Sequence, residues 1–212
     1  APLSGVLRTV TCSVSRRVYS PQALNMRRTL AAPTTVDAMG ISHIALAVKD
    51  LEATHRFYTD VMGFDLVKVE IADMRGGKAR HAFYSTGSPD DQMVAFWDLR
   101  DVPGFGEGYK TDISRDLGLD PFTNHLAFQA DSLDDLATKR DRLKDAGLNV
   151  VEIDHGWVQS VYAEDPDGNV VEFAIVTKGF TEADAAEAIN LLTANDPPMS
   201  PPPTITFHPA AE

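Results

Sequence analysis

The sequence contains a single cysteine, Cys12, among its 212 residues. One cysteine cannot form a disulfide within the chain, and a chain without disulfides suits a reducing compartment. Long apolar runs are missing as well, since none approaches the roughly 18 residues that a membrane span needs. We therefore expect a cytoplasmic protein that has no membrane partner.

Positive charge is scarce: 19 lysines and arginines face 31 acidic residues, and the net charge is −12. Because phosphate binding needs basic surface, this balance argues against a nucleic-acid partner. Residues 1–36 reverse the pattern, with five arginines and no acid, so the rest of the chain carries −17. Such a composition is typical of an organellar transit peptide. The alternatives, which we favour over targeting, are a flexible arm or sequence upstream of a true start at Met26.

A repeat dominates what is present. HIALAVKDL, starting at His43, recurs as HLAFQADSL, starting at His125, 82 positions later. In each copy apolar and polar residues alternate, which indicates a half-buried strand that opens with a histidine. Each strand then meets a helix-capping residue, Asp50 or Ser132. The chain therefore contains two modules that begin alike.

Both modules predict the same order of elements, β-α-β-β-β. In the first, helical spacing of apolar residues follows Asp50 and ends at Gly63, a helix-terminating residue. In the second, a similar stripe follows Ser132 and ends at Gly147. The expected strands cover 41–48, 64–71, 79–85 and 92–98 in the first module, and 124–130, 149–154, 158–163 and 169–176 in the second.

The remaining segments divide the chain further. Thr181 to Asp184 reads as a capping box that starts a short helix ending near Thr193. The Pro-rich stretch 197–209 is more typical of an extended strap than of a domain. We expect five parts: an N-terminal arm or targeting-like segment (1–40), the first module (41–99), a linker (100–122), the second module (123–177), and a C-terminal helix with a Pro-rich tail (178–212).

The motifs in these modules resemble the vicinal oxygen chelate superfamily. It includes glyoxalase I, methylmalonyl-CoA epimerase, fosfomycin-resistance transferases, bleomycin-resistance proteins and extradiol ring-cleaving dioxygenases. The resemblance covers residues 41–177 and implies an α+β fold, in which two βαβββ modules form a cupped mixed sheet around a metal-binding cavity. The motifs that carry it are SHIA (42–45), FYTDVMGF (57–64), NHLAF (124–128) and YAEDPDGNVVEF (162–173).

The resemblance implies a metal site at His43, His125 and Glu172, with Ala95 at the fourth position. Taken singly, each histidine could be an ordinary strand residue. Glu172 gives an independent reason to expect a bound cation, since a carboxylate on a strongly apolar strand is costly to bury unless it is paired or coordinated. Two imidazoles and one carboxylate are typical of non-haem Fe(II) oxygenases, although Mn, Zn, Ni or Co are alternatives. A shifted register would instead bring Gln92 to the fourth position.

Three further residues are candidates for catalysis: Tyr162, His155 and His81. Tyr162 lies ten residues before Glu172, the last ligand, and in the family a tyrosine at this spacing touches the substrate. A rim aromatic that only packs against the sheet would explain Tyr162 equally well. His155 corresponds approximately to a pocket histidine of ring-cleaving enzymes, and His81 shares the inward parity of its strand. The acid-base histidine of those enzymes is missing, because Lys110 and Thr111 occupy its place.

Three functions remain open at this point. The first is a dioxygenase that uses Fe(II) to bind the vicinal oxygens of a small substrate. The second is a glyoxalase-like lyase, epimerase or thiol transferase that uses another divalent metal. The third is a small-molecule binding protein of the resistance type, which the intact ligand set disfavours. The resemblance also implies a homodimer.

Overall fold

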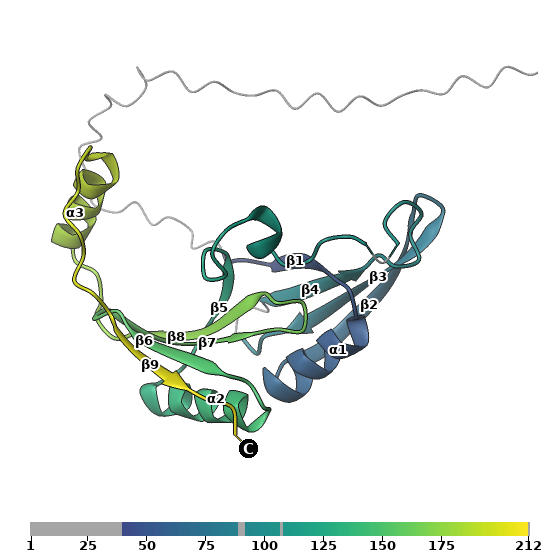
Figure 1. The fold of residues 1–212 in the computed structure, drawn as a ribbon, viewed down its shortest axis with the longest axis horizontal. Coiled ribbons are helices and arrows are strands. Elements are labelled where there is room, and N and C mark those ends of the chain that lie inside the picture. The colour runs from purple at the N-terminus through teal and green to yellow at the C-terminus, as the bar shows by residue number, and fades with distance from the viewer. Residues whose placement is uncertain (1–39, 89–91, 107, 212) are drawn as a thin grey trace, which may run out of the picture. The chain divides into compact units, whose positions relative to one another are not determined.

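A computed structural model describes residues 40–88, 92–106 and 108–211 (Figure 1). The arm expected over residues 1–40, apart from Gly40, lies outside this part of the chain, as does Cys12. The described strands form two sheets, of four and five strands. Among the described residues, no helix is long and apolar enough to cross a membrane.

The first sheet has the strand order β1-β4-β3-β2, with β1 parallel to β4 and the other pairs antiparallel. A short α-helix, which continues as a π-helical turn, connects β1 to β2. The elements are β1 (His43–Val48), α1 (Leu51–Arg56), the π-turn (Phe57–Val61), β2 (Asp65–Met74), β3 (Gly77–Ser85) and β4 (Met93–Asp98).

The second sheet repeats this order as β5-β8-β7-β6 and adds β9 at its edge. Its elements are β5 (His125–Gln129), α2 (Leu133–Asp145), β6 (Val150–Asp154), β7 (Val158–Glu164), β8 (Val170–Val176) and, after α3 (Glu182–Thr193), β9 (Thr204–His208). Each module is thus βαβββ, and the predicted α+β class is confirmed.

The helix starts lie where the sequence placed them. The Asp50 carboxylate accepts hydrogen bonds from the backbone N–H groups of the first turn of α1, at 3.0 and 3.1 Å. Ser132 caps α2 in the same way, and Thr181 with Asp184 forms the complete capping box of α3. These side chains satisfy donors that a helix start otherwise leaves unpaired.

One apolar core joins the two modules. Side chains from the π-turn, from α2 and from the helix-bearing faces of both sheets belong to a single buried cluster. Phe128 packs against this cluster, with its ring 4.8 Å from that of Phe64. Because side chains alternate along a strand, the neighbours of these core residues lie on the opposite face of each sheet, which we call the open face. The residues predicted for the site that lie within strands occupy these open faces: His43, His81, Ala95, His125, Tyr162 and Glu172.

A buried carboxylate links the modules at the β7–β8 turn. The Tyr58 hydroxyl, from the first module, donates to Asp165 Oδ2 at 3.1 Å. The other oxygen of Asp165 accepts the backbone N–H groups of Asp167 and Asn169, at 2.9 Å each, and shapes the turn. Burial raises the pKa of Asp165 from 3.8 to about 6, because removal from water disfavours the ionised form.

This pKa predicts a pH-dependent stability that Asp165→Asn removes. The folded state holds the Asp165 proton more tightly than the unfolded state does, so the protonated carboxyl stabilises the fold. This stabilisation is fully present below the unfolded pKa of 3.8 and is lost as pH rises through about 6. The stability of the wild type relative to Asp165→Asn should therefore fall by up to about 3 kcal/mol across this window. Denaturant unfolding at several pH values measures the difference, with Glu187→Gln on the exposed side of α3 as a matched control. A difference independent of pH would contradict the assignment.

Candidate functional site

Two of the three predicted ligands are adjacent on the open face of the second sheet. Their strands, β5 and β8, pair in parallel, with Ala127 opposite Glu172. His125 Nε2 lies 2.9 Å from Glu172 Oε2. Glu172 is buried, with 5% of its surface exposed, although it lies among apolar strand residues. A buried carboxylate needs an opposite charge or a coordinated cation, and the imidazole nitrogen beside it offers a second donor for such a cation.

The backbone fixes which ring nitrogen of His125 faces Glu172. His125 Nδ1 lies 2.9 Å from the Phe122 carbonyl oxygen, which can only accept, so Nδ1 carries the proton and donates it there. A donated hydrogen bond of this kind orients metal-binding histidines and leaves the other nitrogen free for the metal. The donor chemistry of His125 and Glu172 therefore fits a divalent cation.

Tyr162 and His155 lie next to this pair. The Tyr162 ring contacts the His125 ring at 5.9 Å and the Phe122 ring at 5.3 Å, both edge to face. The Tyr162 hydroxyl lies 3.4 Å from His155 Nε2. Burial, together with the Glu172 charge, raises the pKa of Tyr162 to about 12, so its phenol keeps its proton at neutral pH. We call Phe122, His125, His155, Tyr162 and Glu172 the second-sheet cluster.

His43 lies in a separate group on the open face of the first sheet. Its ring meets Phe83 edge to face at 5.7 Å. Phe83 in turn contacts His81 at 4.1 Å, and His81 stacks on Trp97 at 3.7 Å with 12° between the planes. Burial lowers the pKa of His81, with a further contribution from His43, so His81 is neutral near pH 7. We call His43, His81, Phe83 and Trp97 the first-sheet cluster.

The two clusters do not combine into one metal site within the chain. Across the described residues, no group of three or more His, Cys, Asp or Glu side chains is placed to hold one metal ion. Ala95 pairs with Ala45 and Phe83 in the first sheet and offers no donor side chain. Gln92 lies just before β4, where its backbone oxygen accepts from Thr86.

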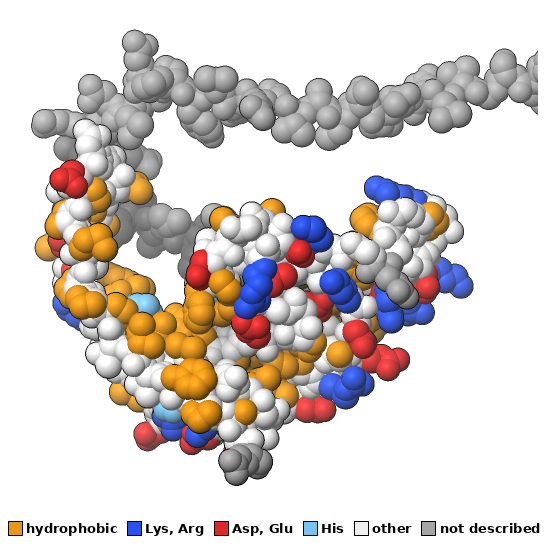
Figure 2. Space-filling view, in the orientation of Figure 1, with side chains coloured by type: hydrophobic (Ala, Val, Ile, Leu, Met, Phe, Trp, Pro, Cys, Tyr) orange, Lys and Arg blue, Asp and Glu red, His pale blue; other side chains and the backbone are white. Residues whose placement is uncertain are grey.

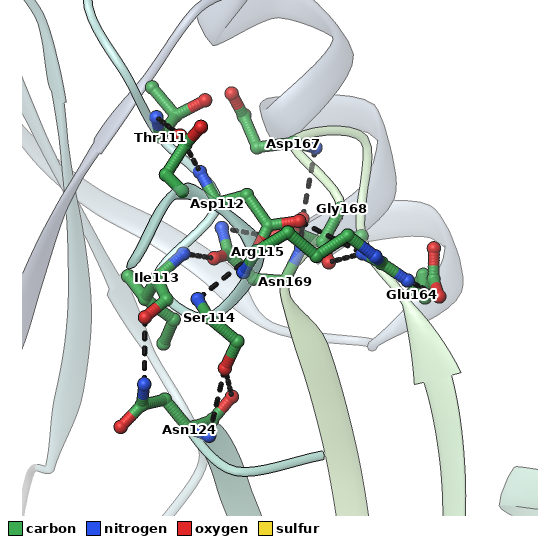
Figure 3. A network of polar contacts seen from close by, with 12 residues as sticks. Thr111, Asp112, Ile113, Ser114, Arg115, Asn124, Glu164, Asp167, Gly168 and Asn169 are labelled. Carbon is green, nitrogen blue, oxygen red and sulfur yellow. Dashed lines mark hydrogen bonds and ion pairs between the residues drawn. The ribbon is translucent and has the colours of Figure 1, made fainter. Parts of the chain in front are cut away.

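The linker before β5 is fastened to the β7–β8 turn, which the sequence did not reveal (Figure 3). The Ile113 backbone N–H donates to Asn169 Oδ1 at 2.8 Å, and Arg115 bridges Asp112 and the Gly168 carbonyl. At its other end the linker carries Phe122, whose carbonyl orients His125. Lys110 instead pairs with Asp116 on the exposed side of the linker.

A cavity of about 430 Å³ adjoins the second-sheet cluster. Phe122 and Tyr162 line it together with Val151 and Phe207. A larger cavity, of about 840 Å³, lies between α1 and strands β2 and β3, on the helix-bearing face of the first sheet. Its lining includes none of the residues of either cluster, so of these two cavities the smaller adjoins the candidate chemistry.

The linker contact predicts a stability cost for Asn169→Ala. Asn169 is 1% exposed, and its loss leaves the Ile113 N–H without its acceptor. Such a loss costs about 1–3 kcal/mol of unfolding free energy. Urea unfolding measures the cost, and hydrogen exchange should show faster exchange at the Ile113 amide. Asn190→Ala, on exposed α3, is the control; equal behaviour of the two variants would contradict this role.

Comparison with known proteins shows the family of this chain. The profile of the Glyoxalase/Bleomycin resistance protein/Dioxygenase superfamily matches residues 40–173. Biphenyl-2,3-diol 1,2-dioxygenase 3 of Rhodococcus globerulus is 30% identical over 136 residues, which span 64% of this chain and 62% of that protein. A probable lactoylglutathione lyase of Synechocystis sp. is 26% identical over 138 residues, or 63% of this chain and 93% of the lyase.

A solved structure shares the fold. The glyoxylase/bleomycin resistance protein/dioxygenase domain from Frankia sp. EAN1pec superposes with a TM-score of 0.50 at 21% identity, over 66% of this chain and 98% of that one. The profile match covers both βαβββ modules, from β1 into β8. The chain therefore belongs to the Glyoxalase/Bleomycin resistance protein/Dioxygenase superfamily.

Proposed function

We propose that the protein is a metal-dependent dioxygenase of the extradiol type, acting on a small substrate with two vicinal oxygens. The observation that carries this proposal is the buried Glu172 carboxylate, which lies 2.9 Å from His125 Nε2. The other ring nitrogen of His125, Nδ1, already donates to a backbone carbonyl. The 30% identity to a biphenyl-diol dioxygenase supports the same chemistry.

His43, His125 and Glu172 would hold the metal. Two imidazoles and one carboxylate suit Fe(II) and leave coordination positions open, and Ala95 leaves the fourth family position without a donor. Mn, Zn, Ni or Co are compatible with the same donors. When bound, the cation supplies Lewis acidity and a template for the two substrate oxygens.

The other side chains of the second-sheet cluster would orient the substrate and move protons. Tyr162, whose phenol is protonated at neutral pH and whose pKa burial raises further to about 12, would donate a hydrogen bond to a substrate oxygen. His155 Nε2, 3.4 Å from the Tyr162 hydroxyl, would accept the phenol proton as the phenol oxygen takes up a proton from a substrate hydroxyl, which leaves Tyr162 neutral. His81, held by its stack on Trp97, orients the substrate from the first-sheet cluster.

We propose further that the protein works as a homodimer, with each site shared between two copies. Within one chain, His43 belongs to the first-sheet cluster, whereas His125 and Glu172 belong to the second-sheet cluster. A second copy that brings its own first-sheet cluster against this second-sheet cluster would complete the ligand set.

A glyoxalase-like lyase, epimerase or thiol transferase is the second candidate. The observation that favours it is the lactoylglutathione lyase match, which spans 93% of that relative. The same three donors would then polarise a substrate oxygen without using O2. Turnover under strictly anaerobic conditions distinguishes this candidate from the dioxygenase.

Metal binding should depend on both ligands of the second-sheet cluster. Protein purified without oxygen and loaded with Fe(II) should lose at least about tenfold in metal affinity on His125→Ala or Glu172→Gln. His208→Ala is the matched control, because it removes an imidazole from the helix-bearing face, where His208 pairs with Glu152. Oxygen uptake with a panel of catechols tests the reaction. Unchanged metal content in His125→Ala would refute the metal site, and no uptake with any catechol would refute the dioxygenase.

Mixing variants should show whether the site is shared. His43→Ala and His125→Ala are each expected to be inactive alone, since each lacks one ligand. After mixing and subunit exchange, a heterodimer recovers one intact site, so activity should return to at most about half per mixed dimer. His125→Ala mixed with Glu172→Gln is the control, because both changes fall in the same half-site. If the first mixture stays as inactive as the control, the shared site is wrong.

A further inference from the structure

Strand β9 extends the second sheet beyond the part of the chain that the family profile matches. The profile ends at residue 173, whereas β9 spans Thr204–His208 and pairs antiparallel with β6. Its register continues the row that contains the candidate site. Phe207 lies opposite Val151, Val151 opposite Tyr162, and Tyr162 opposite Glu172. Strand β9 therefore lies at the edge of the sheet that contains Glu172, beside β6 (Figure 1).

Contacts on the helix-bearing face fasten this strand. His208 Nε2 lies 2.7 Å from Glu152, and beyond the strand Ala210 N donates to Asn149 Oδ1 at 3.1 Å. The Ala211 N–H donates to the Lys144 carbonyl of α2, also at 3.1 Å. The strand is thus held in place without using its open-face side chains.

The open-face side chains of β9 are apolar and remain largely uncovered. Phe207 is 61% exposed and Ile205 is 62% exposed. Ile205 pairs with Ile153 of β6, so these two residues widen the apolar surface of Val151 and Phe207 along the strands. Figure 2 shows hydrophobic side chains gathered over this sheet and along α3.

The cavity beside the second-sheet cluster gives this surface a shape. Its volume of about 430 Å³ falls within the range of small-molecule sites. Phe207 lines it together with Phe122, Val151 and Tyr162, and the Tyr162 ring contacts the His125 ring. A molecule held at its oxygens by the metal site would extend its other end along this cavity.

We propose that β9 binds the hydrophobic part of the substrate, with Phe207 as a specificity-determining residue. The substrate class is then a vicinal diol with an aryl or alkyl substituent, rather than an unsubstituted diol. This inference rests on the proposed function for the diol end. The inference about the apolar end of the substrate rests only on the cavity and on β9.

The test compares catechol with a phenyl-substituted catechol as ligands of the Fe(II)-loaded protein, without oxygen. Phe207→Ala should weaken binding of the substituted compound by about tenfold, because it removes an aromatic contact, and leave catechol within about twofold. Phe207→Leu keeps an apolar side chain at the same strand position and should lose less affinity for the substituted compound than Phe207→Ala does. Thr206→Ala, on the opposite face of β9, should leave the affinity for both ligands unchanged.

A second measurement separates this inference from the proposed function. Biphenyl, which has no oxygens, should bind the metal-free protein in a manner that depends on Phe207. If the protein binds biphenyl but binds no metal, or consumes no oxygen with any catechol, the proposed function fails and the β9 site stands. If Phe207→Ala leaves the preference for the phenyl group unchanged, the β9 inference is overturned. Loss of the dimer in Phe207→Ala, seen by sedimentation with that preference unchanged, would assign this face to a contact between copies instead.

Discussion

The buried carboxylate of Glu172 is the constraint on which the candidate site depends. It lies on β8, between β5 and β7, with core residues on either side of it in the sequence. A charge in this position needs an opposite charge or a coordinated cation, because removal from water is costly. His125 is oriented toward it by the Phe122 carbonyl, and that carbonyl is positioned by the linker fastened to Asn169. The linker network and the ligand pair are thus parts of one arrangement.

The shared core explains why the ligands lie on two open faces. Both modules direct their helix-bearing faces into one cluster, which leaves the opposite faces free for chemistry. The modules diverge on those faces: Glu172 in the second sheet corresponds to Ala95 in the first, and β9 extends only the second sheet. One repeated fold therefore carries an asymmetric surface, in which the second module has the carboxylate, the tyrosine and the adjoining cavity.

The sequence predicted local features well and long-range contacts poorly. Asp50, Ser132 and Thr181 act within their own helix turns, so their caps could be inferred from neighbouring residues. The π-turn at Phe57–Val61 was not expected, because the apolar stripe there fits an ordinary helix. The pairing of β9 with β6 and the linker contact with Asn169 join distant segments, and neither leaves a periodic signal. The tail was expected to be extended, but its place at a sheet edge depends on tertiary structure.

The coordination shell of bound Fe(II) would show directly whether two imidazoles and one carboxylate hold the metal. X-ray absorption on Fe(II)-loaded protein, prepared without oxygen, reports the number of imidazole ligands. We expect two imidazoles in the wild type and one in His43→Ala and in His125→Ala, with Glu172→Gln losing the carboxylate signal. An iron spectrum that is identical in the wild type and His125→Ala would contradict it.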